Sequence, residues 1–344
     1  MVHDDDDANV SAANGNRYLA FTELMRLDKV GDGGAFKSTA KAFSPGDTTA
    51  AYGGHVYAQA VWAASQTVRR GFVVNNMTGF FIFPGDTTRP FIYHVRNLRD
   101  GGRYCTRSVD VVQDPQRGVC FTCTCIFKVD EEPGDYDFQE PCDLAQKYGS
   151  ALGDRRPEDW SEAPSVDSPW YWELAAAKDG PRDAFPGLSL RKVDMAPYNQ
   201  DHRGPLERRQ LQFYSTTGEM PPVTEEPNLH ACAHLYACDR NSLFLIPNHL
   251  DVGDDYRQMA SLSYSVVFHV SSKEMAMQVK EGEKRWFCQE ARISRTGGNR
   301  GLHVSRLWSP DGRHIATTWQ DGLVRIGKPS RWTAKIEGLK KAKL

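Results

Sequence analysis

The fold is decided by the stretch PNLHACAHLYACDRNSLFLI, residues 227–246, whose apolar content is typical of a long buried helix, with Asn228 as its predicted N-cap. Leu235 and Leu243 fall on one stripe at helical spacing, and Asp239 lies in that stripe, four residues from each of them. A carboxylate on a buried face is costly unless it has a partner or a role. Asp239 is therefore a candidate functional residue, and an ion pair with a cation such as Arg257 is the structural alternative.

The first half of the chain repeats this organisation. GGHVYAQAVWAASQTVRRG starts with two glycines, and residues 55–68 are apolar on almost every side. Strand-like alternating runs follow both helices, and the turns DPQRG and SPDGR separate the last two runs of each half. A helix is also expected in FTELMRLDKV near the start. We therefore predict an α+β fold made by internal duplication, in which two tandem helix-wrapped antiparallel sheets form a double hotdog. A generic α+β pair is the alternative that this pattern allows.

The predicted regions follow from composition. Residues 1–16 are an acidic tail that we expect to be disordered, 17–130 the first hotdog domain, 188–328 the second, and 329–344 a basic tail. Residues 131–187 are rich in Pro, Asp, Glu and Gly, which predicts a surface linker without a packed core, apart from a short helix around WYWELAAAK. Its aromatic residues Trp170, Tyr171 and Trp172 are expected to attach it to the protein.

The amino-acid composition argues against nucleic acid as a partner and against a membrane-spanning segment. Lys and Arg number 42 against 44 Asp and Glu, so there is no basic excess of the kind that nucleic-acid binding requires. No apolar run approaches the roughly 18 residues of a membrane-spanning helix. The N-terminus lacks the basic and apolar regions of a secretory signal. The eight cysteines show no disulfide framework and are expected to be reduced thiols inside a cell.

One cluster could bind a metal ion. His230, His234 and Cys238 are spaced at i, i+4 and i+8 of the predicted helix, and two histidines at this spacing can bind zinc. The segment lacks the glutamate that follows the first histidine in metalloproteases. Helix packing is therefore the preferred interpretation, and we predict neither a metal nor a cofactor.

Several pieces, in this order, resemble the type II acyl-CoA thioesterases, a double-hotdog family of bacteria, fungi and peroxisomes. They are YGGHVYAQAV, FFIFPGDTTRPFIYHVRNLRDGGRY, LYACDRNSLFLIP, MASLSYSVVFH and IATTWQDGLVRIG, spread over about residues 18–327. The resemblance implies hydrolysis of an acyl-CoA to a free acid and CoA. It also implies a catalytic trio at Asp239, Ser261 and Gln320, where Ser261 replaces the usual threonine.

The resemblance also marks the start of the first helix. Relatives commonly have Gly-Gly-Gln where this chain has Gly53, Gly54 and His55, which we therefore assign to substrate binding. Backbone N–H groups at this helix start are candidates for stabilising the oxyanion. The hydrocarbon chain of the substrate is expected to lie along apolar residues such as Phe80, Phe81 and Phe83 or their neighbours. Histidine at position 55 in place of the family's glutamine leaves the trio intact, and it bears on the substrate preference.

The chemistry explains why these residue types are needed. The sequence has no G-x-S-x-G nucleophile elbow, so direct attack by water is the preferred route. Asp239 would be the general base, because burial raises the pKa of a carboxylate toward neutrality. Ser261 and Gln320 have neutral donors and acceptors that can hold the water and the carboxylate.

Two rival functions stay open from the sequence. A hotdog enoyl-CoA hydratase would usually need an Asp–His pair, and a D-x-N-P-x-H string is not present. A non-catalytic acyl-CoA binder is the other rival. The natural substrate could be a fatty acyl-CoA or the CoA ester of a specialised metabolite. A homo-oligomer is compatible with the predicted fold.

The C-terminal residues suggest a location. Ala342, Lys343 and Leu344 resemble the peroxisomal signal S-K-L, with alanine in place of serine. An exposed basic tail is the alternative interpretation. We expect these residues to bind the peroxisomal import receptor and the protein to act in fatty acid metabolism.

Overall fold

The computed structural model describes residues 19–45, 49–168, 185–200, 202–280 and 282–327. The predicted acidic tail, the helix around WYWELAAAK with Trp170, Tyr171 and Trp172, and the basic C-terminal tail lie outside the described residues. Within these ranges, no helix is both long enough and apolar enough to cross a membrane.

The fold is built on one antiparallel sheet of twelve strands, in the order β1-β2-β4-β5-β6-β3-β9-β12-β11-β10-β8-β7. The strands of the first half are β1 Leu27–Val30, β2 Ala35–Ser38, β3 Phe72–Phe81, β4 Ile92–Asp100, β5 Tyr104–Val112 and β6 Val119–Val129. Those of the second half are β7 Leu188–Lys192, β8 Gln210–Thr216, β9 Tyr256–Phe268, β10 Phe287–Gly297, β11 Arg300–Trp308 and β12 His314–Ile326.

The sheet confirms the internal duplication. In chain order, β2, α3 and β3–β6 correspond to β8, α7 and β9–β12, and the two sets have matching strand orders, β2-β4-β5-β6-β3 and β8-β10-β11-β12-β9. The halves are joined where β3 pairs with β9, from Asn76 opposite Val267 to Phe80 opposite Ser263. This arrangement is the double hotdog that the sequence predicts.

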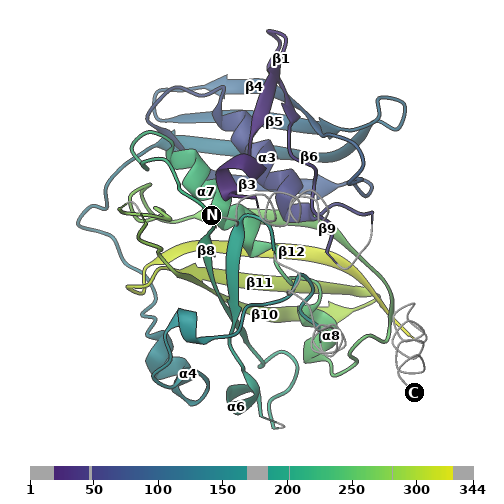
Figure 1. The fold of residues 1–344 in the computed structure, drawn as a ribbon, viewed down its shortest axis with the longest axis vertical. Coiled ribbons are helices and arrows are strands. Elements are labelled where there is room, and N and C mark those ends of the chain that lie inside the picture. Colours follow the sequence, from purple (N-terminus) through teal and green to yellow (C-terminus); the bar gives the residue numbers. More distant parts are fainter. Residues whose placement is uncertain (1–18, 46–48, 169–184, 201, 281, 328–344) are drawn as a thin grey trace, which may run out of the picture.

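The two central helices explain why their sequences are apolar on nearly all sides. Helix α3 spans Gly53–Ser65 and α7 spans Pro227–Cys238, and they lie beside each other on one face of the sheet (Figure 1). One side of each helix therefore contacts strands and another contacts the partner helix. Eleven residues of each helix are buried, so helical amphipathicity is weak in both.

Polar contacts also lock the halves together. The hydroxyl of Tyr52, just before α3, donates to the carbonyl of Tyr236 in α7 at 2.6 Å. Asn228, predicted as an N-cap, is instead the second residue of α7, after Pro227. Its side chain accepts from the Val74 amide at 2.8 Å and donates to the Phe72 carbonyl at 2.9 Å, which ties α7 to β3.

Two helix predictions are wrong in extent. The segment 227–246 is not one helix, because α7 ends at Cys238 and a separate short helix, α8, begins at Leu245 and ends at His249. FTELMRLDKV forms only the short helix α2, Phe21–Leu24, before the chain enters β1.

The prediction of a linker without a packed core is also wrong. The segment contains helix α4, Leu144–Leu152, and the 3₁₀ helix η1, Pro157–Asp159, and the short helix α6, Ala196–Asn199, follows β7. Tyr148 and Trp160 are buried in a core of their own with Trp308. This core is held by Glu290, which accepts from the Trp308 indole at 2.9 Å and from the hydroxyl of Tyr148. The sequence signal is weak because a few aromatic residues carry the packing.

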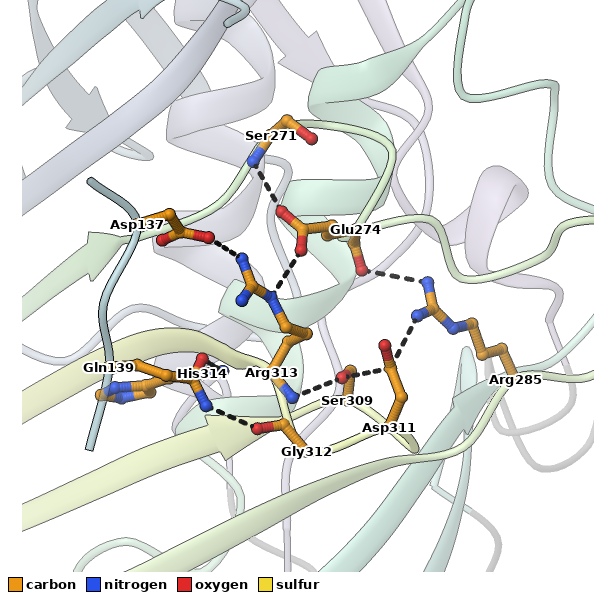
Figure 2. A network of polar contacts seen from close by, with 10 residues as sticks. All are labelled: Asp137, Gln139, Ser271, Glu274, Arg285, Ser309, Asp311, Gly312, Arg313 and His314. Atoms are coloured by element: carbon orange, nitrogen blue, oxygen red, sulfur yellow. Dashed lines mark hydrogen bonds and ion pairs between the residues drawn. The ribbon is translucent and has the colours of Figure 1, made fainter. Parts of the chain in front are cut away.

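The start of the connecting segment is held by a polar network at the β11–β12 turn (Figure 2). Gln139 donates from its side-chain amide to the Gly312 carbonyl at 2.8 Å. Arg313 forms ion pairs with Asp137 and with Glu274, the latter at 2.8 Å. The connection is therefore fixed to the second half before α4 begins.

Candidate active site

Asp239 is held at the end of α7, where it is the C-cap residue and only 7% exposed. The preceding carbonyl, that of Cys238, accepts from the Tyr264 hydroxyl and from the Gln289 amide, both at 2.8 Å. These two residues belong to β9 and β10, so the sheet fixes the end of the helix. The carboxylate therefore owes its position to the end of α7 and not to a stripe along a longer helix.

Three neutral donors bind the Asp239 carboxylate. The Gly54 amide donates to Oδ2 at 2.7 Å, the Gln320 side-chain amide donates to Oδ1 at 2.9 Å, and the Ser242 hydroxyl donates to Oδ1 at 3.0 Å. Arg257, the cation considered as an alternative partner, is exposed on β9. Within the described residues, the Asp239 carboxylate is therefore bound by neutral N–H and O–H groups. Because Gly54 belongs to the first half and Gln320 to the second, these hydrogen bonds join the two halves of the chain.

The chemical consequence is a shift of the pKa of Asp239. Burial raises this pKa from its usual value to about 7, while the donors Ser242, Gly54 and Gln320 oppose the shift because they favour the charged form. A carboxyl group with a pKa near neutrality can accept a proton effectively at physiological pH.

Gln320 connects Asp239 to Ser261. Its side chain is fully buried on β12, and Nε2 donates to Asp239 Oδ1 at 2.9 Å and to Ser261 Oγ at 2.8 Å. The structure thus brings together all three residues of the predicted trio, with Gln320 in the middle. Ser261 is half-buried, so it is the most solvent-accessible residue of the trio, because Asp239 and Gln320 are both buried.

A β-bulge orients Ser261. On β9, Tyr264 pairs with Gln320, and the register then shifts so that Ser261, and not Leu262, lies opposite Gly322. Without this extra residue, strict alternation from Tyr264 would direct Ser261 to the other face of the sheet. The bulge therefore brings the serine to the side on which Gln320 lies.

Gly53, the first residue of α3, allows this close contact between the halves. A Cβ atom on Gly53 would lie 2.9 Å from the Phe81 ring and 3.0 Å from Asp239 Oδ2. Of the phenylalanines considered for the hydrocarbon chain, Phe81 therefore lies beside the carboxylate, whereas Phe80 is 53% exposed. The Gly54 amide, considered for the oxyanion, is bonded to Asp239.

His55 is buried next to this helix start and does not extend into solvent. Its ring packs edge-on against Tyr236, and neither ring nitrogen makes a hydrogen bond of ordinary geometry. Burial lowers the pKa of His55 to about 4, and the nearby Gln59 offsets part of this effect. His55 is therefore neutral at physiological pH. Its assignment to substrate binding stays a prediction.

Ser242 is a site residue that the sequence analysis missed, because the helix was expected to continue through it. The chain instead turns at Asn241, which has a φ of 61° and is buried. Asn241 donates to Gln210 at 3.0 Å and to Asp167 at 3.3 Å. Asparagine adopts this left-handed conformation more easily than most residues, so it was the available signal of a helix end.

The histidines of α7 are engaged in packing. His230 contacts the Pro221 carbonyl at 2.8 Å and the Met277 amide at 3.0 Å. His234 contacts the Tyr214 hydroxyl at 2.8 Å and the Met275 carbonyl at 2.9 Å. These contacts use both nitrogens of each ring, in agreement with the packing interpretation. Within the described residues, no group of three or more potential ligands is placed to hold a metal ion.

Comparison with known proteins gives a consistent result. The family model "Acyl-CoA thioesterase N-terminal domain" matches residues 43–128, and "Acyl-CoA thioesterase C-terminal domain" matches residues 157–324. Mouse acyl-coenzyme A thioesterase 8 is 26% identical over 295 residues, covering 83% of each chain. Acyl-CoA thioesterase 2 of Haemophilus influenzae is 24% identical over 290 residues, covering 80% of this chain and 88% of its own.

Solved structures share the fold. The acyl-CoA thioesterase II TesB2 of Mycobacterium marinum aligns with a TM-score of 0.63 and 21% identity, over 90% of this chain and 99% of its own. A hot dog fold protein of unknown function from Alicyclobacillus acidocaldarius aligns with a TM-score of 0.62 and 16% identity, over 90% of this chain and 98% of its own.

Proposed function

Because this chain belongs to the type II acyl-CoA thioesterase family and is an acyl-CoA thioesterase, we propose that Asp239, Gln320 and Ser261 form its hydrolytic site. The observation that carries the proposal is the buried Asp239 carboxylate, which has a pKa of about 7 and is bound by neutral donors from both halves of the chain. A carboxylate held in this way is poised to accept a proton, whereas a structural carboxylate would be expected to pair with a cation.

In the proposed reaction, Asp239 removes a proton from a water molecule as the water oxygen attacks the thioester carbonyl carbon. The tetrahedral intermediate then collapses, the carbon–sulfur bond breaks, and CoA leaves as a thiolate that takes the proton from Asp239, which restores the carboxylate. The carboxylic acid is the other product. Burial of Asp239 makes it a stronger base than an exposed carboxylate, and this is its contribution to the first step.

Gln320 and Ser261 are proposed to orient the reactants. The Gln320 amide is bound to both other members, so it fixes the Asp239 carboxylate relative to the serine. Ser261 Oγ accepts from this amide, which leaves its own proton free to donate to the water or to the substrate carbonyl. The Gly54 amide keeps Oδ2 in place.

Thiol release from a panel of acyl-CoA esters tests the function and finds the substrate class. The panel should vary chain length, branching and oxidation state, and should include CoA esters of specialised metabolites. Hydrolysis of a subset, with free acid and CoA formed in equal amounts, is expected. Binding without thiol release across the panel would contradict the proposed hydrolysis and favour a non-catalytic binder.

The pH dependence of kcat/KM should report the ionisation of Asp239. Because only the deprotonated carboxylate can act as a base, activity is expected to rise with pH and level off above about 7, the pKa of Asp239 in the folded protein. Initial rates with one fixed substrate, measured from about pH 5 to about pH 9, would establish this profile. A profile that is flat below pH 7 would contradict the assignment.

The variant Ser242→Ala is expected to move this profile to higher pH. It removes a donor that favours the charged form of Asp239, and a hydrogen bond to a charged group corresponds to roughly one pKa unit. The plateau at high pH should fall less than the rate at pH 6. Ser108→Ala, at a buried serine in the first half, is the matched control and should leave the profile in place. An unchanged midpoint in Ser242→Ala would show that this hydroxyl does not tune the base.

We further propose that the protein acts in peroxisomes, in fatty acid metabolism. The support is the tripeptide Ala342, Lys343 and Leu344, which would bind the import receptor. A fluorescent fusion that preserves this C-terminus should be peroxisomal, and deletion of the three residues should move it to the cytosol without loss of activity in vitro. A deletion variant that is still peroxisomal would show that the signal lies elsewhere.

A further inference from the structure

The duplication creates two junctions between the central helices. At the first, the start of α3 meets the end of α7, and this junction contains Gly54 and Asp239. At the second, the start of α7 lies near the end of α3. Because the two halves have the same order of elements, the second junction is the counterpart of the first.

A pocket of about 660 Å³ opens at this second junction. This volume lies within the range of small-molecule sites, which is roughly 300–1,000 Å³. The end of α3 contributes Trp62, Gln66 and Thr67, and the start of α7 contributes Leu229. The remaining wall comes from α2 and the β1–β2 hairpin, which includes Phe36.

The second junction lacks the group that would make it catalytic. Where α7 is followed by Asp239, α3 ends at Ser65 and is followed by Gln66 and Thr67, which have no acidic side chain. Thr67 is also engaged, because its Oγ1 accepts from the Arg107 guanidinium at 2.9 Å. A ligand in this pocket would therefore meet no counterpart of the proposed base.

The lining indicates the chemistry of a ligand. Arg26 and Lys29 are exposed at the pocket, and within the described residues no ion pair involves either side chain. Trp62 is half-buried and offers a planar aromatic surface, while Phe36 and Leu229 form a buried apolar part. Asp32 is the one acidic residue of the lining. Two cations beside an indole suit a phosphorylated aromatic ligand, through charge attraction and stacking.

We propose that this pocket binds the adenine nucleotide end of coenzyme A or its thioesters at a second, non-hydrolytic site. The phosphates would lie at Arg26 and Lys29, and the adenine would stack on Trp62. The inference rests on the acyl-CoA specificity of the family and not on the assignment of Asp239.

Calorimetric titration with adenosine 3′,5′-bisphosphate tests the site. The wild-type protein should bind it at this pocket in addition to any binding at the hydrolytic site. The charge-reversed variant Arg26→Glu/Lys29→Glu should lose one equivalent of binding, or bind that equivalent about tenfold or more weakly, because like charges at a phosphate site repel. Lys280→Glu/Lys284→Glu changes two exposed lysines of the second half and is the matched control. This control should bind as the wild type does.

Two further measurements separate this site from the hydrolytic one. Quenching of tryptophan fluorescence by the nucleotide should disappear in Trp62→Phe, and kcat/KM for acyl-CoA at low concentration should be unchanged in the Arg26→Glu/Lys29→Glu variant. Absence of binding in the wild type, or equal binding in the charge-reversed variant, would overturn the proposal. A parallel loss of hydrolysis in that variant would also overturn it, because the pocket would then belong to the catalytic site.

Discussion

Asp239→Asn is expected to reduce acyl-CoA hydrolysis by about 100-fold or more while the protein stays folded. Asparagine has nearly the same shape and can keep a carbonyl oxygen toward Gln320 and Ser242, which donate to Oδ1 in the wild type, while its NH2 group replaces Oδ2 and loses the hydrogen bond from the Gly54 amide. It cannot accept a proton from water. The measurement is kcat and KM for the best acyl-CoA of the panel, with circular dichroism to verify the fold.

A neighbouring carboxylate provides the control for this variant. Asp321 follows Gln320 on β12 and pairs with Arg300 near the surface. Asp321→Asn makes the same chemical change without touching the site, so its activity should be close to that of the wild type. An Asp239→Asn protein with turnover like that of Asp321→Asn would refute the role of Asp239 as the base.

Asp239→Asn should also change how the free energy of unfolding depends on pH. The pKa of Asp239 is about 7 in the folded protein against 3.8 ordinarily, so the folded state retains a proton that the unfolded chain releases. The stabilisation from this group is fully present below about pH 4 and is lost as pH rises through about 7. It corresponds to about 4 kcal/mol. The free energy of unfolding of Asp239→Asn, relative to the wild type, should therefore increase over this window.

The second half alone, residues 188–344, is expected to be unstable or inactive although it contains Asp239, Ser261 and Gln320. Separation removes β3 from the edge of β9, α3 from the side of α7, and the Gly54 amide from Oδ2 of the carboxylate. An uncovered apolar helix face and an unpaired central strand favour aggregation. Size-exclusion chromatography and thiol release on the expressed fragment would measure both effects.

Co-expression provides the control for the fragment. Residues 1–187 supplied as a separate chain would restore the β3–β9 pairing and the Gly54 contact, so recovery of soluble, active protein is expected. Full activity from residues 188–344 alone would show that the first half is not needed for hydrolysis. The proposed contribution of Gly54 would then be wrong.

The sequence by itself determined the architecture. Two segments that are apolar on nearly every side, each followed by alternating runs with a turn at the same place, are sufficient to predict two buried helices and two antiparallel sheets. The prediction succeeds because a helix that is buried on several sides must be apolar on those sides, and because strand residues alternate between the two faces of a sheet. The sequence also singled out Asp239, because an isolated carboxylate among apolar residues is costly.

The tertiary structure alone decided how the site is assembled. The end of α7 depends on Tyr264 and Gln289, which bind the Cys238 carbonyl from distant strands. The orientation of Ser261 depends on a register shift between β9 and β12, and the Gly54 contact depends on the pairing of the two halves. Each of these contacts joins residues far apart in the chain, and local propensity and periodicity contain no information about such contacts. For the same reason the sequence suggested a longer helix and missed Ser242, which reaches Asp239 only because the chain turns at Asn241.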